Sequence, residues 1–204
     1  MQLMRERAVS SSRVPAASAP TILLPVPGEL RVPAAASGFG GASGSGGGSG
    51  PAGASGGGGT EQPLASGEDA RAKQIYDYLV CQYHFTPAQA AGIVGNMEVK
   101  SGLNPSTENA AEGAIGLCQW EAGRRTDLEN FAVSQGRSAT EWKTQVDFMV
   151  HELGTDESGA GSALLSASTA TQAATVFDED YEPSAGITRS ERIADADNVA
   201  AEFG

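Results

Sequence analysis

The sequence predicts one all-α domain over residues 61–204, preceded by a segment that is not expected to fold. Beyond residue 66, apolar residues recur at the three- and four-residue spacing of amphipathic helices, and few segments alternate apolar with polar residues. Signals that start helices recur in the same part of the chain. Residues 37–59 consist almost entirely of Gly, Ser and Ala, so they have too little apolar surface to offset the entropy lost on ordering.

Three zones follow from this composition. Residues 1–36 form an arm rich in Pro, Ala and Ser, and residues 37–60 form a Gly/Ser linker with a root-mean-square reach of about 25–30 Å. Residues 61–204 have about the usual size of a domain and can bury one core. We expect the arm to be disordered. The alternative is that residues 21–26 dock onto a larger assembly, while the linker leaves the domain free to move.

The first helix is expected from Ser66. Ser66 and Asp69 have the spacing of a capping box, in which a hydroxyl and a carboxyl bond to the first free amides of the helix. Apolar residues then recur at helical spacing, at Ile75, Leu79 and Val80.

The second helix has a stronger start. Thr86 supplies a hydroxyl cap, Pro87 suits the first helical position, and Gln89 stands three residues after the cap. One face of this helix is apolar, with Ala91, Val94 and Met97. The helix should end near Gly102, because glycine adopts the left-handed conformation that often terminates helices.

Five further helical segments complete the domain. Residues 124–134, 160–166, 171–181 and 189–203 carry apolar residues at helical spacing. Ser138 and Glu141 form another capping-box pattern, ahead of a helix with Trp142, Val146, Met149 and Leu153 on its buried stripe.

The charge of the chain excludes some classes of function. The net charge is −12, and residues 1–60 carry four arginines against two glutamates, which leaves −14 on the domain. Nonspecific nucleic-acid binding needs a basic face, so we expect no nucleic-acid partner. No run approaches the roughly 18 apolar residues of a membrane span. Residues 1–29 make a poor signal peptide, because prolines close their short apolar core.

The cysteines and histidines do not indicate a metal site. Cys81 and Cys118 match no zinc spacing, and they are either reduced core residues or one bridge in a protein that works outside the cell. His84 and His151 have no ligand partners at metal spacing, so we interpret both as structural or solvent-facing. We expect neither a metal nor an organic cofactor.

Two motifs lie between the second and third helices. The first is Lys-Ser-Gly-Leu-Asn-Pro at residues 100–105, and the second is Gly-Ala-Ile-Gly-Leu-Cys-Gln-Trp at residues 113–120. Together they resemble the E-S-G-x-N-P and G-A-x-G-L-x-Q pattern of soluble lytic transglycosylases and related lysozymes. Residues 86–96, 123–125 and the F-x-x-x-Y-E element at 177–182 look specifically like the phage tail lysozyme family. The resemblance covers residues 72–201.

This resemblance implies an activity on peptidoglycan and association with a virion. The family cleaves the bond between N-acetylmuramic acid and N-acetylglucosamine, by hydrolysis or transglycosylation, with a glutamate as the general acid. Such an acid needs a pKa raised toward neutrality by its surroundings. By resemblance, the residues that contact the glycan are Ser101, Gly113, Ala114, Gly116, Gln119, Trp120 and Tyr181.

Lys100 stands where the family has its glutamate, whether the alignment is made on Asn96 or on Ser101. A lysine normally titrates near 10.4 and is a poor proton donor to a glycosidic oxygen. Glu98 is the nearest carboxyl, but two residues turn a helix by about 200°, so Glu98 would serve only if the helix unwinds before Val99.

Several side chains keep two interpretations. Lys100 either complements the helix dipole or binds anionic groups of the peptide stem. Glu108 and Glu112 either position water or are solvated loop residues, and Glu121 either acts there or balances a neighbouring arginine. Trp120 either stacks on a sugar or packs in the core, and Tyr181 either extends its hydroxyl to the glycan or ends an apolar face.

Two functions remain at this stage. One is a lysozyme-like enzyme on peptidoglycan glycan strands, and the other is a catalytically inactive protein that binds glycan or serves as a structural virion component. The identity of residue 100 distinguishes them, because the rest of the motif is intact.

Overall fold

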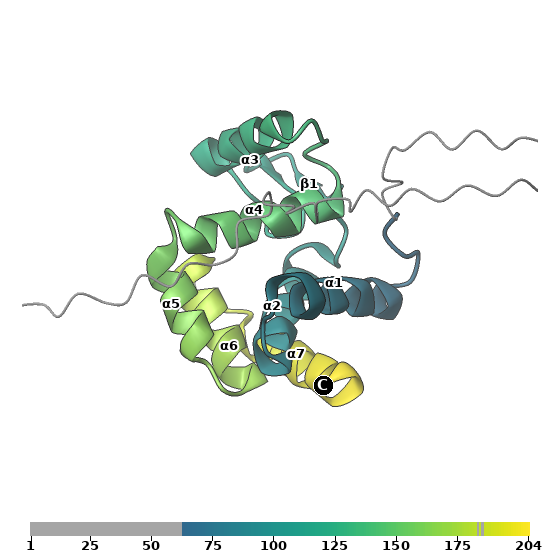
Figure 1. Ribbon diagram of the computed structural model, residues 1–204, viewed down its shortest axis with the longest axis vertical. Coiled ribbons are helices and arrows are strands. Elements are labelled where there is room, and N and C mark those ends of the chain that lie inside the picture. The colour runs from purple at the N-terminus through teal and green to yellow at the C-terminus, as the bar shows by residue number, and fades with distance from the viewer. Residues whose placement is uncertain (1–62, 183, 185) are drawn as a thin grey trace, which may run out of the picture.

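The computed structural model describes residues 63–182, 184 and 186–204 (Figure 1). The predicted arm, the linker and the docking segment at 21–26 lie outside the described residues. The described part confirms the all-α class, with seven α-helices, one short π-helix and a two-stranded sheet of two residues per strand. These elements are α1 (Glu68–Tyr83), α2 (Pro87–Ser101), β1 (Glu108–Asn109), β2 (Ala114–Ile115), α3 (Ala122–Ser134), α4 (Trp142–Gly154), α5 (Ser158–Ser166), α6 (Ala170–Val176), η1 (Phe177–Tyr181) and α7 (Arg189–Phe203).

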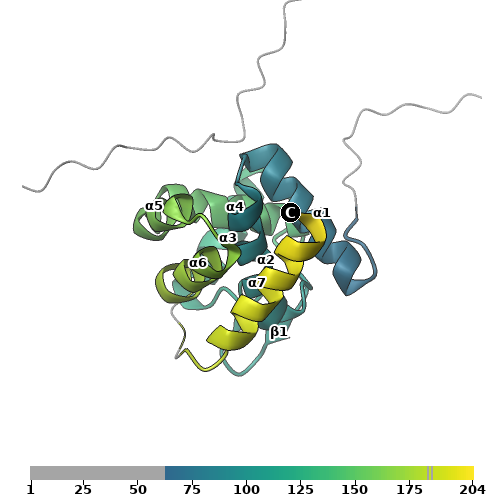
Figure 2. The same ribbon diagram turned by 90° about the horizontal axis from the view of Figure 1, so that it is seen from below.

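Helix α2 lies at the centre of the helical packing, between α1, α6 and α7 (Figures 1 and 2). Every residue from Gln89 to Met97 is buried. Two glycines allow the neighbouring helices to approach closely. A Cβ at Gly92 would lie 2.4 Å from Cβ of Ala173 on α6, and one at Gly95 would lie 2.5 Å from the backbone N of Ala196 on α7.

The ends of α2 are as predicted. The Thr86 hydroxyl accepts a hydrogen bond from the amide of Gln89, and the Gln89 side chain accepts one from the amide of Thr86. Gly102 is left-handed, with φ 59°, and its amide donates to the carbonyl of Glu98. Hydrogen bonds therefore cap both ends of α2, and the position of its last turn is fixed.

Two of the predicted caps are wrong. Helix α1 begins at Glu68 with Gly67 as its cap residue, so the Ser66 hydroxyl is one residue too early to bond to the first turn. Helix α4 begins at Trp142, three residues later than a cap at Ser138 would require. The Ser138 hydroxyl instead accepts from the amide of Thr140 in the preceding turn. In both cases the hydroxyl bonds locally or faces solvent, because the backbone enters the helix later.

The other helices agree closely with their predicted ranges. The final helix, Arg189–Phe203, has the predicted bounds, and the third and fifth begin two residues early. The predicted helix at 171–181 divides into α6 and the π-helix η1, in which Phe177 and Tyr181 are fully buried. No helix among the described residues is long and apolar enough to cross a membrane.

The small sheet was not predicted. Strands β1 and β2 are antiparallel, pairing Glu108 with Ile115 and Asn109 with Ala114, and Ile115 also forms a bridge with Trp120. Strands of two residues are too short to show an alternating pattern in the sequence. This sheet holds residues 113–120 in a compact fold beside the end of α2.

Candidate functional site

The end of α2 forms one side of the site. Lys100 lies in the last turn, with a side chain that is 30% exposed. The Ser101 hydroxyl donates to the carbonyl of Met97, and the Ser101 carbonyl accepts from the hydroxyl of Thr107. Arg71 on α1 donates to the carbonyl of Gly102 at 2.8 Å. These bonds anchor the helix end to α1 and to the following loop.

The glycine loop, residues 113–119, forms the other side. Gly113 and Gly116 have φ of 69° and 79°, a region that favours glycine. A Cβ at Gly116 would also lie 2.6 Å from the Gln145 side chain. The Gln145 amide donates to the carbonyls of Pro105 and Ala139 and accepts from the amide of Leu117. One buried side chain from α4 therefore sets the path of the loop, and Gly116 leaves room for it.

Gln119 closes the glycine loop. Its φ is 54°, which is uncommon for a residue with a side chain and is often found at functional sites. Its side-chain NH₂ group donates to the carbonyls of Thr107 and Gly116, at 3.1 and 2.8 Å. The side chain is half-buried, and these two bonds leave its carbonyl oxygen as the acceptor of the amide. Ala114, at the start of the loop, is buried.

Trp120 and Tyr181 are packed in the core. Their exposed fractions are 1% and 0%, so neither ring presents a face to solvent. The carboxylate of Glu152 accepts hydrogen bonds from the indole of Trp120 and from the Tyr181 hydroxyl, and it pairs with Arg124 at 2.7 Å. The Arg124 guanidinium also lies over the Tyr181 ring, 4.6 Å from its centroid. This placement corresponds to the packing interpretation of both aromatic residues, and Glu152 satisfies their polar groups.

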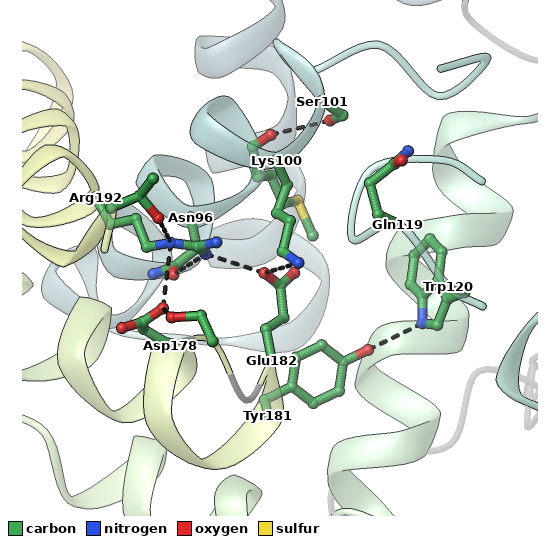
Figure 3. Close-up of polar contacts among 12 residues, drawn as sticks. Asn96, Lys100, Ser101, Gln119, Trp120, Asp178, Tyr181, Glu182 and Arg192 are labelled. Carbon is green, nitrogen blue, oxygen red and sulfur yellow. Dashed lines mark hydrogen bonds and ion pairs between the residues drawn. The ribbon is translucent and has the colours of Figure 1, made fainter. Parts of the chain in front are cut away.

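Behind Lys100 lies a glutamate that sequence reasoning missed. Glu182 Oε2 is 4.0 Å from the Lys100 ammonium and 3.0 Å from the Arg192 guanidinium, and the Glu182 side chain is 2% exposed (Figure 3). Burial raises the pKa of Glu182 to about 6, against the opposing effects of Lys100 and Arg192. Glu182 is the last residue of the F-x-x-x-Y-E element, and this motif is the signal in the sequence that points to it.

Glu98 lies in a different environment from Lys100. Helix α2 is regular through Ser101, without the unwinding before Val99 that Glu98 would need to face the site. Partial burial raises the pKa of Glu98 to about 7, with further contributions from the negative charges of Asp195, Glu68 and Asp69. Glu98 therefore belongs to an acidic cluster with α7 and the start of α1.

The loop carboxylates are solvent-facing. Glu108 is exposed and pairs with Arg125 at 3.4 Å, and Glu112 is exposed and accepts from the side chain of Asn109. Glu121 is exposed at the start of α3. Their positions correspond to the solvated interpretation.

The cysteines are both free, so the predicted alternative of a single bridge is not present. Cys118 is a buried core residue as predicted, but Cys81 is exposed, so its predicted place in the core is wrong. His84 ends α1 in a left-handed conformation, and the exposed His151 ring lies 5.4 Å from that of Phe131. Within residues 63–182, 184 and 186–204, no group of three His, Cys, Asp or Glu residues is arranged to hold a metal ion.

Comparison with known proteins agrees with the motif. The family model described as phage tail lysozyme matches residues 70–203, which begin in the first turn of α1, end with α7 and include both sides of the site. This match confirms the resemblance found in the sequence. No curated protein matches the chain.

Proposed function

We propose that this chain, which belongs to the phage tail lysozyme family, uses residues 61–204 as a lysozyme-like domain that binds peptidoglycan glycan strands, and that Lys100 makes it a slow or inactive glycosidase. The bond addressed is the one between N-acetylmuramic acid and N-acetylglucosamine. The observation that carries the proposal is the pairing of Lys100, at the end of a well-anchored α2, with the buried Glu182.

Lys100 is chemically unsuited to the acid step. Cleavage of a glycosidic bond passes through an oxocarbenium-like state and needs a proton on the leaving oxygen. An ammonium that normally titrates near 10.4 holds its proton too tightly, and its positive charge opposes the developing cation. Loss of a general acid typically lowers the rate about 10²–10⁴-fold.

Neither nearby glutamate replaces the missing acid. Glu98 has a pKa near neutrality, which suits a general acid, but its carboxylate lies with Asp195 and the start of α1. Glu182 is 2% exposed and lies behind Lys100, so it does not reach a glycan. The site therefore lacks a suitable acid for two reasons: residue 100 is a lysine, and neither nearby glutamate is placed to reach the glycosidic oxygen.

The recognition side of the proposed site rests on the glycine loop and Gln119, since Trp120 and Tyr181 are buried in the core. Gly113 and Gly116 allow a backbone path in which loop amides and carbonyls come close to a ligand. The carbonyl oxygen of Gln119 is an acceptor for an N-acetyl N–H or a sugar hydroxyl. Ser101 and Ala114 support these groups from the helix end and from β2. Binding without cleavage follows from this combination.

Virion association is part of the proposal. It rests on the family and on a chain in which residues 1–60 have the composition of an arm and linker. A domain tethered through a flexible linker reaches glycan strands around its attachment point.

The test uses the full chain and insoluble purified peptidoglycan. We expect the protein to sediment with the peptidoglycan and to release few soluble fragments. Gln119→Ala should weaken binding about tenfold, the value of one good hydrogen bond. Gln135→Ala, an exposed glutamine at the end of α3, is the matched control and should bind normally.

Two results would contradict the proposal. Absence of sedimentation with peptidoglycan would favour the other candidate, a structural virion component. Rapid release of fragments by the unaltered chain would show that Lys100 does not limit the chemistry. A melting temperature measured for each variant excludes loss of folding as the cause of weak binding.

A further inference from the structure

We propose that Glu182 is a positioning residue of this site, a buried carboxylate that directs the side chain at position 100 and that would share a proton with a carboxyl placed there. This inference rests on the proposed function, in which position 100 is the place of the general acid, and it assigns Glu182 as the residue that contacts that position. In this chain, Glu182 is the ion-pair partner of Lys100. In a chain with glutamate at position 100, the two carboxyls would share one proton near neutral pH.

The geometry places the two side chains face to face. The Lys100 ammonium is 4.0 Å from Glu182 Oε2, and Figure 3 shows the Lys100 chain directed toward the Glu182 carboxylate. Lys100 is 30% exposed whereas Glu182 is 2% exposed, so Lys100 reaches solvent and Glu182 is almost completely buried. The second oxygen, Glu182 Oε1, is buried without a hydrogen-bond partner. A buried oxygen of this kind is normally paired, so the carboxylate depends on few neighbours for its stabilisation.

Each element packed against Glu182 contributes a defined group. Arg192 on α7 donates to Glu182 Oε2 at 3.0 Å and to Asn96 at 2.6 Å. The buried thiol of Cys118, from the glycine loop, adjoins the carboxylate, and burial followed by the Glu182 charge raises the pKa of that thiol. Arg192 also pairs with Asp178 on η1, with 3.2 Å between Arg192 Nε and Asp178 Oδ1.

Lys100 and Arg192 are therefore the cations that balance Glu182, and Arg192 is already shared. Asp178 draws on Arg192 and on Arg189, at 3.2 and 3.0 Å. Removal of the Lys100 charge would leave Glu182 with one shared guanidinium. The pKa of Glu182 is raised by burial even with both cations present. Each cation should consequently have a measurable effect on its titration.

A glutamate at position 100 would form a pair of carboxyls with Glu182. Its side chain is about one bond shorter than lysine, so its carboxylate would lie within about 4–6 Å of Glu182. At this separation the two carboxyls titrate as a pair, and the second proton leaves about 1–3 units above the ordinary carboxyl pKa near 4.3. The pair therefore retains one proton at a pH where an isolated surface carboxyl is ionised.

The first test is a carbon-13 titration of glutamate carboxyls in the full chain. The Glu182 signal is assigned from its loss in Glu182→Gln. We expect Lys100→Met to raise the titration midpoint of Glu182 by about 1 unit or more, because an adjacent cation is lost. Lys73→Met is the matched control, since Lys73 is an exposed lysine on α1 paired with Asp77, and it should leave the midpoint unchanged. A change below about 0.3 unit in Lys100→Met would overturn the inference.

The second test is the pH profile of fragment release by Lys100→Glu. Adding Glu182→Gln should move the alkaline limb of the profile down by about 1 unit or more, because the carboxyl at position 100 loses the partner with which it shares a proton. Adding Asp180→Asn, the exposed carboxyl two residues away, should leave the limb in place. An unchanged profile in the Glu182→Gln double variant would overturn the inference.

The two tests separate this inference from the proposed function. If Lys100→Glu releases nothing and does not bind peptidoglycan, while Lys100→Met still shifts the Glu182 titration, the proposed function fails and the pairing stands. If Lys100→Glu is active but the Glu182 titration does not respond to Lys100→Met, the proposed function stands and the role of Glu182 fails.

Discussion

Replacement of Glu98 by glutamine should stabilise the protein at alkaline pH and have little effect at acid pH. Glu98 is half-buried on α2, and its pKa is raised to about 7, first by burial and then by the charges of Asp195, Glu68 and Asp69. The folded state therefore binds the Glu98 proton more tightly than the unfolded state, in which the pKa is near 4.5. Stability is lost as the pH rises from 4.5 through 7, and the ionised carboxylate then destabilises the fold.

The magnitude follows from this difference. A displacement of about 2.5 units corresponds to an upper bound of about 3.4 kcal/mol at 1.36 kcal/mol per unit. Glu98 is partly exposed, and its carboxylate neighbours lie at the surface, so solvent screening reduces the expected gain to about 1–2 kcal/mol. At pH 4.5, where folded Glu98 is already protonated, the gain should fall below about 0.5 kcal/mol.

The assay is urea unfolding of the full chain at pH 4.5 and pH 8, followed by tryptophan fluorescence. Glu98→Gln should have a higher free energy of unfolding than the unaltered chain at pH 8 only. Glu202→Gln, an exposed glutamate on α7, is the control and should change little at either pH. An equal gain at both pH values, or a loss at pH 8, would refute the burial and charge argument for Glu98.

Three further predictions concern packing, capping and thiol reactivity. Gly95→Ala should destabilise the protein by about 1–3 kcal/mol or prevent folding, because its Cβ would lie 2.5 Å from the α7 backbone. Chemical denaturation measures this effect, and a free energy of unfolding equal to that of the unaltered chain would contradict the packing of α2. Thr86→Ala should lower the free energy of unfolding by about 0.5–2 kcal/mol through loss of the helix cap, whereas Thr86→Ser should retain most of it. In the folded protein at pH 8, an aromatic disulfide reagent should modify the exposed Cys81 and not Cys118, whose thiol is buried and has a raised pKa; two equivalents reacting at the same rate without denaturant would contradict the burial of Cys118.

Local signals in the sequence determined much of the fold. The Thr86 cap and the left-handed Gly102 were predicted because each depends on residues within one turn. Ser66 and Ser138 carried similar signals but do not cap a helix, since the entry point of each helix is set by packing of the following residues. A capping pattern therefore indicates that a helix is near, and tertiary contacts choose its first residue.

The site was predictable where it depends on a contiguous motif. Lys100 and the glycine loop were located because residues 100–105 and 113–120 resemble contiguous motifs of a known family. The roles of Trp120 and Glu182 were not, because each depends on a partner far along the chain. Trp120 bonds to Glu152, 32 residues later, and Glu182 faces Lys100, 82 residues earlier. Burial of a charged group beside another is a property of the fold, and no local pattern predicts it.

In the proposed function, position 100 is the place of the proton donor and Lys100 limits the chemistry. The most direct measurement compares release of soluble muropeptides from purified peptidoglycan by the full chain, by Lys100→Glu and by Lys100→Gln, which has nearly the same shape as glutamate but no acid. We expect Lys100→Glu to release fragments at least about 10²-fold faster than the other two proteins. Equal release by the unaltered chain and by Lys100→Glu would contradict the claim and show that another group donates the proton.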